Sequence, residues 1–282
     1  MSILFGRENF YELFGYVPAW PNLVYTVSVP RLPVDPPAGR VRQFHGSTRP
    51  DLADAYNRHN ATRTGTAVRP TVTAPWTAGR VGLLWTDARG AAEGYVVIEG
   101  GGDAINVVDF AGQAEQVLRV VARHARAGGV KEVRFPELHA ADPLAGRLRR
   151  HFCRETFTWS RSGGAMALCL NLHSTLTKMA GELAHRLRRS DLAGWRGQLL
   201  IAGPREQVML RIASGKVSAH PAVGSAPNAI RGGHEIVQLL LGVADPDEIV
   251  SAASLRLSGQ AHRLLGTLFP NQHCRLGAWD RF

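Results

Sequence analysis

The sequence has few cysteines for its 282 residues. Cys153, Cys169 and Cys274 lie far apart and fit neither a disulfide framework nor the ligand spacing of a zinc site. We therefore expect no metal and a reducing, cytoplasmic location. Long hydrophobic runs are also missing: none approaches the roughly 20 residues that a membrane span requires. This absence predicts no membrane span.

Lysine is almost absent, so the net charge of +10 comes from arginine. The arginines are scattered, and the densest runs, 147–154 and 186–189, lie toward the ends of predicted helices. Positive charges there complement the helix dipole. This distribution favours a solvated surface, with an anionic cofactor or an acidic surface as the alternative. A basic nucleic-acid binder remains as a third functional hypothesis, and we expect no nucleic-acid partner.

Residues 41–172 show a regular order of predicted strands and helices, which indicates an α/β layered domain on a mixed sheet. The glycines at 100–102 predict a hairpin turn, and Asp142 followed by proline predicts a helix start. We expect 155–159 and 166–172 to form an antiparallel pair. The other predicted strands are 41–44, 81–85, 94–98, 105–110 and 130–135, and the other helices are 50–63 and 113–127.

The segments on either side suggest two further parts. Residues 1–38 predict a strand at 3–5, a helix at 8–14, a strand at 23–29 and an extended proline-rich linker from 30. Residues 173–282 predict a small α+β domain. Its predicted helices are 175–189, 234–241, one that starts at 246, and 260–268. Its predicted strands are a hairpin formed by 198–201 and 207–212, and a further strand at 217–219. The predicted domains are therefore 1–38, 39–172 and 173–282.

The strand–helix order of 41–172 resembles that of the GNAT acetyltransferase superfamily. Phe10-Tyr11-Glu12-Leu13-Phe14-Gly15-Tyr16 resembles a late helix motif of that superfamily. The order of parts resembles the enhanced-intracellular-survival (Eis) family of tandem acetyltransferases. The resemblance implies the end of a first GNAT domain, a complete GNAT-like domain and a sterol-carrier-protein-like domain. Further matching residues are Ala55, Tyr56, Asn57, Gly65, Arg69, Trp76, 265–270 and 280–282.

The resemblance implies an N-acetyltransferase that moves acetyl from acetyl-CoA to a primary amine on a small molecule or peptide. Such a reaction needs a base, an oxyanion donor and an acid for the leaving thiolate. Tyr11 takes the acid role by resemblance, and the terminal carboxylate of Phe282 takes the role of the base. The family also implies a homo-oligomer.

Trp279 and Asp280 are candidates for the amine pocket, through cation–π contact and charge respectively. The alternative is that Trp279 packs in the core and Asp280 is solvated.

The complete GNAT-like domain lacks the basic, glycine-rich turn that binds the CoA pyrophosphate in this superfamily. Its equivalent, residues 108–114, has one glycine, no arginine, and Asp109, which would repel phosphate. We expect this domain not to bind acetyl-CoA, and we expect the equivalent turn of the first domain to lie before Met1. This chain is then expected to be truncated and inactive alone. The alternative function is a non-enzymatic scaffold that binds an apolar ligand in its sterol-carrier-like domain.

Overall fold

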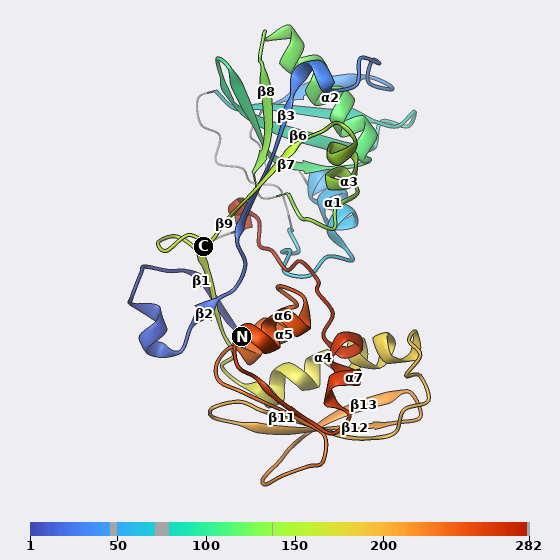
Figure 1. Cartoon of the computed structure of the whole chain (residues 1–282). Coiled ribbons are helices and arrows are strands. Elements are labelled where there is room, and N and C mark those ends of the chain that lie inside the picture. Colours follow the sequence, from blue (N-terminus) through green and yellow to red (C-terminus); the bar gives the residue numbers. More distant parts are fainter. Residues whose placement is uncertain (46–49, 71–78, 137, 281–282) are drawn as a thin grey trace. The chain divides into compact units, whose positions relative to one another are not determined.

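The computed structural model describes residues 1–45, 50–70, 79–136 and 138–280 (Figure 1). The chain forms two compact units, and each combines segments that are far apart in the sequence. The central unit comprises Asn22–Thr158 and Arg275–Phe282, and the flanking unit comprises Met1–Pro21 and Trp159–Cys274. Every helix in the described residues is too short or too polar to cross a lipid bilayer.

A seven-stranded mixed sheet forms the centre of the central unit, in the order β4-β5-β6-β7-β8-β3-β9. All neighbouring strands are antiparallel except β7 and β8. The elements are β3 (Asn22–Ser28), β4 (Val41–Phe44), α1 (Pro50–Asn60), β5 (Val81–Thr86), β6 (Ala92–Gly101), β7 (Ala104–Ala111), α2 (Ala114–Ala127), β8 (Glu132–Pro136), α3 (Pro143–Arg150) and β9 (Arg154–Thr158), with short 3-10 turns at Val29–Arg31 and Ala278–Asp280.

The side chains of β6 divide the central unit into three layers. Val96 and Ile98 belong to the core that contains the buried faces of α2 and α3. Tyr95 and Val97 belong to a second core, which contains the buried face of α1. Because successive side chains of a strand point to opposite faces, α1 covers one face of the sheet and α2 with α3 covers the other.

The flanking unit contains a three-stranded sheet, β1-β10-β2, and a five-stranded sheet, β13-β12-β11-β14-β15. Its elements are β1 (Ser2–Phe5), the 3-10 turn η1 (Tyr11–Phe14), β2 (Val17–Pro18), β10 (Ala165–Leu168), α4 (Leu172–Arg188), β11 (Gly197–Ala202), β12 (Gln207–Ala213), β13 (Lys216–Pro221), β14 (Ala229–Arg231), α5 (Ile236–Leu241), α6 (Pro246–Ala252), β15 (Arg256–Ser258) and α7 (Ala261–Leu268). Helix α4 contacts β12, β13 and α7.

The structure confirms the predicted fold class of α/β and α+β parts with mixed sheets. The strongly periodic segments form the expected helices and strands, and the hairpin at 100–102 joins β6 to β7. Asp142 caps α3 as predicted, because its side chain accepts a hydrogen bond from the backbone N of Leu144. Strands β2, β14 and β15 were not predicted, since two or three residues carry no readable alternation.

The predicted antiparallel pairing of 155–159 with 166–172 is wrong. Strand β9 pairs with β3, which the sequence analysis placed in the first domain. Strand β10 pairs instead with β1 and β2 in the flanking unit, and α4 already begins at Leu172. Relative to the predicted domains, β3 and β10 have therefore exchanged places: β3 belongs to the central unit and β10 to the flanking unit. The division into three domains at residues 38 and 172 stays a prediction.

The predicted helix over 8–14 is reduced to the short turn η1 at Tyr11–Phe14. Asn9 has a left-handed backbone with φ of 58°, and a left-handed residue interrupts a right-handed helix. Phe10, Leu13 and Phe14 consequently remain about half exposed or more.

The proline-rich segment 30–39 packs along α2 of the central unit. The Gln116 side chain accepts from the backbone N of Ala38 at 2.9 Å and donates to its O at 2.7 Å. The Arg126 guanidinium donates to the carbonyls of Leu32 and Pro33, both at 2.7 Å. This segment is therefore fastened to α2 rather than forming a free linker.

Replacing Arg126 with alanine tests this attachment. We expect the Arg126→Ala variant to lose about 1 kcal/mol of unfolding free energy and to be cleaved faster by proteases within 30–39. Arg123→Ala, an exposed arginine on the same helix, is the matched control and should change neither quantity. Equal cleavage rates in the two variants would contradict the attachment.

Candidate functional site

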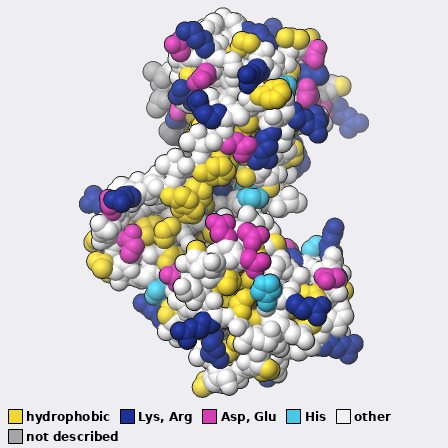
Figure 2. All heavy atoms as spheres, in the orientation of Figure 1, with side chains coloured by type: hydrophobic (Ala, Val, Ile, Leu, Met, Phe, Trp, Pro, Cys, Tyr) yellow, Lys and Arg dark blue, Asp and Glu magenta, His cyan; other side chains and the backbone are white. Residues whose placement is uncertain are grey.

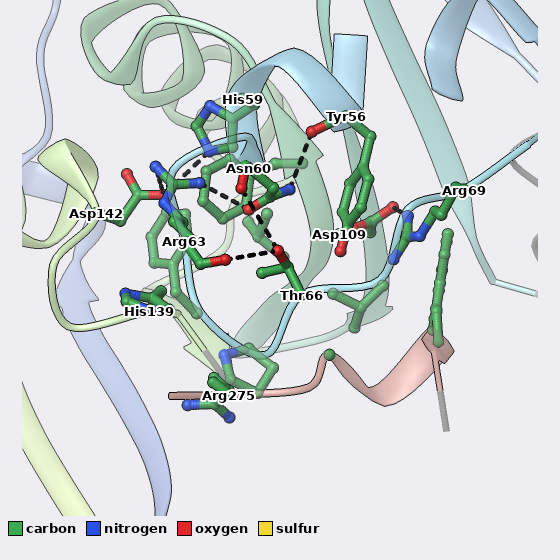
Figure 3. Close-up of a pocket in the computed structure, with 17 residues that line it drawn as sticks. Tyr56, His59, Asn60, Arg63, Thr66, Arg69, Asp109, His139, Asp142 and Arg275 are labelled. Atoms are coloured by element: carbon green, nitrogen blue, oxygen red, sulfur yellow. Dashed lines mark hydrogen bonds and ion pairs between the residues drawn. The ribbon is translucent and has the colours of Figure 1, made fainter. Parts of the chain in front are cut away.

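The candidate site lies in the central unit, where β7 and β8 separate. The two parallel strands pair only over Ala104–Asn106 and Glu132–Arg134. Beyond these residues the strands continue without pairing to each other, and crevices at the carboxyl ends of parallel strands are common ligand sites. A pocket fills this position (Figure 3), lined by residues from α1 and its following loop, β7, the β8–α3 segment and the C-terminal segment.

The pocket is small and lined by polar side chains. Its volume is about 70 Å³, enough for a few water molecules but well below the roughly 300 Å³ of a typical small-molecule site. The charged and histidine side chains that line it are Arg63, Arg69, Arg275, Asp109, Asp142, His59 and His139. The opening between the strands is therefore largely filled by the protein's own side chains.

Asp142 joins three elements on one side of this pocket. Its carboxylate caps α3 and accepts from His59 Nε2 at 3.0 Å and from the Arg63 guanidinium at 2.8 Å. Burial opposes ionisation of this carboxyl, but the hydrogen bond from His59 and the charge of Arg63 outweigh it and lower the pKa of Asp142.

His59 is held by a hydrogen bond at each ring nitrogen. The backbone N of Gly112 donates to Nδ1 at 3.3 Å, so Nδ1 is the acceptor and Nε2 carries the proton that is donated to Asp142. With both nitrogens occupied, His59 ties α1 to the end of β7 and to α3. This arrangement suits a structural histidine better than a catalytic base.

Arg69 is the centre of a second buried network. Its guanidinium contacts Asp109 at 2.7 Å and binds both carboxylate oxygens of Asp280, at 2.7 and 2.9 Å. The hydroxyl of Tyr95 donates to Asp109 at 2.7 Å, and the hydroxyl of Tyr56 donates to Asp280 at 2.9 Å. Burial disfavours the charged guanidinium, but the charge of Asp109 and the hydrogen bond to Asp280 raise the pKa of Arg69 above its usual value.

The structure corrects two expectations about these carboxylates. The alternative expectation of a solvated Asp280 is wrong, because only 5% of its side chain is exposed. Asp109 is expected to repel phosphate at the start of the stretch equivalent to the CoA turn, yet it is buried within β7, the strand predicted over 105–110, where it pairs with Arg69. Arg69 entered the sequence analysis only through a family resemblance, since no spacing pattern marks its carboxylate partners.

The sequence-predicted site residues that the structure describes are divided between the two units. Trp279 lines the pocket, packs against the core beneath α1, and has the Arg80 guanidinium 5.4 Å from its ring centre. Tyr11 lies in η1 of the flanking unit. Trp76 and Phe282 lie outside the described residues. The roles of Tyr11, Trp279, Asp280 and Phe282 toward a substrate stay predictions.

The turn that carries Tyr11 is held firmly within the flanking unit. Gly15 ends it with a left-handed backbone at φ of 87°, and the His234 ring occupies the space that a Cβ atom would need. Tyr16 follows, and its hydroxyl lies 2.7 Å from Ser2 Oγ. The half-buried Tyr11 ring packs against the rings of Phe10 and Tyr16.

The described residues contain no cluster of three or more histidine, cysteine, aspartate or glutamate side chains suited to a metal ion. A second described pocket, beside α5 in the flanking unit, has a volume of about 30 Å³. That space holds one or two water molecules and is too small for a lipid.

The fold of the chain is similar to that of GCN5-related N-acetyltransferases. The crystal structure of one from Anabaena variabilis has a TM-score of 0.74 and 14% identity, covering 100% of this chain and 72% of that chain. One from Kribbella flavida has a TM-score of 0.68 and 18% identity, covering 100% and 71%. Eis1 from Mycobacterium abscessus has a TM-score of 0.62 and 16% identity, covering 99% and 72%. No protein-family profile and no curated protein matches the sequence.

The depressed pKa of Asp142 predicts how stability depends on pH. A carboxyl whose pKa is lower in the folded state stabilises the fold above its ordinary pKa of 3.8 and loses this contribution as pH falls through the folded value. Asp142→Asn should therefore cost about 2–3 kcal/mol at neutral pH, and the difference from the wild type should shrink below pH 3.8. Urea unfolding of both proteins across this range measures it.

Asp54→Asn, on the exposed face of α1, serves as the control and should leave stability nearly unchanged. A cost for Asp142→Asn that stays constant down to strongly acidic pH would show that the carboxylate charge does not stabilise the site.

Proposed function

We propose that this chain, which has the fold of GCN5-related N-acetyltransferases, belongs to an enzyme that transfers acetyl from acetyl-CoA to a primary amine. The observation that carries the proposal is the similarity of fold over the whole chain. The amine nitrogen attacks the thioester carbonyl, a C–N bond forms and the C–S bond breaks. A base takes the proton from the amine, and an acid protonates the departing thiolate.

Tyr11 is the proposed acid. Phenols have an ordinary pKa of about 10 and thiols of about 8.5, so proton transfer from a phenol to a thiolate is only mildly uphill. The Tyr11 ring is half-buried in a turn that Gly15 and His234 fix in place. This fixed position supports a role that requires a defined distance to a leaving group. The terminal carboxylate of Phe282 remains the proposed base.

The central unit offers little to an acyl donor. Asp109 points into the buried network with Arg69, and the pocket between β7 and β8 has a volume of only about 70 Å³. Beside the start of α2, an open hollow of about 630 Å³ is lined by Asp87 and Glu93 together with Arg58, so its acidic side chains do not favour phosphate groups. The Gln116 side chain there binds the backbone of Ala38. We therefore do not assign the donor site to this unit.

The remaining functional hypotheses have less support. On the face shown in Figure 2, lysine and arginine side chains are spread over the surface among acidic ones rather than gathered in a stripe. A nucleic-acid interface would be expected to concentrate them. An apolar-ligand carrier would need a larger cavity than the one described beside α5.

Calorimetry with acetyl-CoA on residues 1–282 tests the assignment of the donor site. Because the central unit has a filled pocket and no basic turn, we expect no saturable heat at micromolar concentrations. Desulfo-CoA is a suitable second titrant, since it keeps the phosphates and removes the thiol. Stoichiometric binding of either compound would contradict the assignment, and loss of that binding on Gln116→Glu, which adds a repelling negative charge, would place the donor site at α2.

Replacing Tyr11 with phenylalanine tests the acid. In the product of the complete gene, Tyr11→Phe should lower kcat for acetyl transfer to a primary amine by about 100-fold or more, with little change in KM for acetyl-CoA. Tyr16→Phe is the matched control, because the Tyr16 hydroxyl is bonded to Ser2. The assay measures thiol release. Unchanged turnover of Tyr11→Phe would remove Tyr11 from the acid role.

A further inference from the structure

We infer that Arg69 is a positioning residue, which holds the C-terminal segment 275–280 on the central unit and so places the end of the chain for the reaction. The catalytic part of this inference rests on the proposed function, whereas the attachment itself does not. The segment joins the central unit although the preceding residues, Trp159–Cys274, belong to the flanking unit.

The contacts between Arg69 and Asp280 have the geometry of a strong, directional pair. Two guanidinium nitrogens meet two carboxylate oxygens at 2.7 and 2.9 Å, the bidentate arrangement that adds specificity to charge. The side chains are 9% and 5% exposed, so solvent screens the pair far less than an exposed ion pair. A surface salt bridge contributes little, but this one is buried.

The network around the pair accounts for its charges. Arg69 faces two carboxylates, Asp109 and Asp280, which leaves one negative charge in excess when both are ionised. Each carboxylate also accepts a phenol hydroxyl, from Tyr95 and Tyr56 respectively. The Arg69 guanidinium lies 3.5 Å from the centre of the Tyr56 ring. Every charged group in the set is therefore hydrogen-bonded, and the two phenol donors help to stabilise the carboxylate charge that the single guanidinium does not balance.

Tyr56, Asn57 and Arg69, which the sequence analysis names only through a family resemblance, have a common structural role in this attachment. Asn57 donates to the backbone O of Arg69 at 2.7 Å and accepts from its backbone N at 2.9 Å. Tyr56, the neighbouring residue, supplies the ring and hydroxyl described above. Tyr56 and Arg69 therefore bind the Asp280 carboxylate directly, and Asn57 holds the backbone of Arg69 in position.

The segment is also held at points other than Asp280. The backbone N of Arg275 donates to the carbonyl of Thr64 at 3.2 Å, and the partly buried Trp279 packs against the core beneath α1. Asp280 is the last of these contacts toward the end of the chain. Phe282 follows Asp280 by two positions in the sequence, and each residue spans at most about 3.6 Å, so fixing Asp280 limits the reach of the chain end to about 7 Å.

Two variants separate attachment from folding. Arg69→Met removes the cation and leaves two buried carboxylates, whereas Asp280→Ala leaves the Arg69–Asp109 pair intact in the core. Asp280→Ala therefore keeps the test decisive if Arg69→Met does not fold. Arg42→Met, at an exposed position of β4, is the matched control.

The first measurement is amide hydrogen exchange of residues 275–280, with α2 as the internal reference for folding. We expect exchange of the segment to become at least about 100-fold faster in Arg69→Met and Asp280→Ala, with α2 unchanged. Arg42→Met should match the wild type. A segment that stays protected in both variants would overturn the inference, whatever the activity.

The second measurement is acetyl transfer by the product of the complete gene. We expect kcat to fall by about 100-fold in both variants while KM for acetyl-CoA stays within about twofold, because the end of the chain supplies the base and not the donor site. If hydrogen exchange shows that segment 275–280 is released in both variants but kcat is unchanged, the positioning role is overturned. A wild-type protein without transferase activity would refute the proposed function, and hydrogen exchange would still decide whether Arg69 holds the segment.

Discussion

The pairing of Arg69 with Asp109 and Asp280 is the interaction on which the central unit depends most. It joins a loop after α1, a strand in the middle of the sheet and the last described part of the chain. The three segments are far apart in sequence, and none of them could bury its charge alone without a large desolvation cost. Because loss of Arg69 would leave both carboxylates without their cation, this one guanidinium links the three segments.

The same principle explains why the separation of β7 and β8 does not produce an open cleft. Two carboxylates, Asp142 and Asp109, each gather cations and hydrogen-bond donors into the opening. One set fastens α1 to α3, and the other fastens the C-terminal segment. The chain thus has a fold similar to that of GCN5-related N-acetyltransferases, while side chains of the central unit occupy the space between β7 and β8.

Local signals in the sequence predicted most of the helices and strands but not which strands pair with each other. The periodicity of 113–127, the Asp142–Pro143 start and the glycine after 241 each act within a single helix, so they can be read directly from the sequence. The sheet to which β3 or β10 belongs depends on pairing between distant residues, which alternation does not encode. The buried network was missed for the same reason: Asp109 looks like a surface residue until Arg69, 40 positions earlier, is placed beside it.

The exchange of β3 and β10 between sheets has a consequence for the order of folding. The chain passes from one unit to the other at residues 21, 158 and 274, so neither unit is contiguous. During synthesis, the sheet of the central unit can assemble once β9 has emerged, but Asp280 follows only after the whole of Trp159–Cys274. Until then, Arg69 can pair with Asp109 but lacks its second carboxylate partner, Asp280. Contacts of such long separation form slowly, which makes closure of the C-terminal segment a natural last step of maturation.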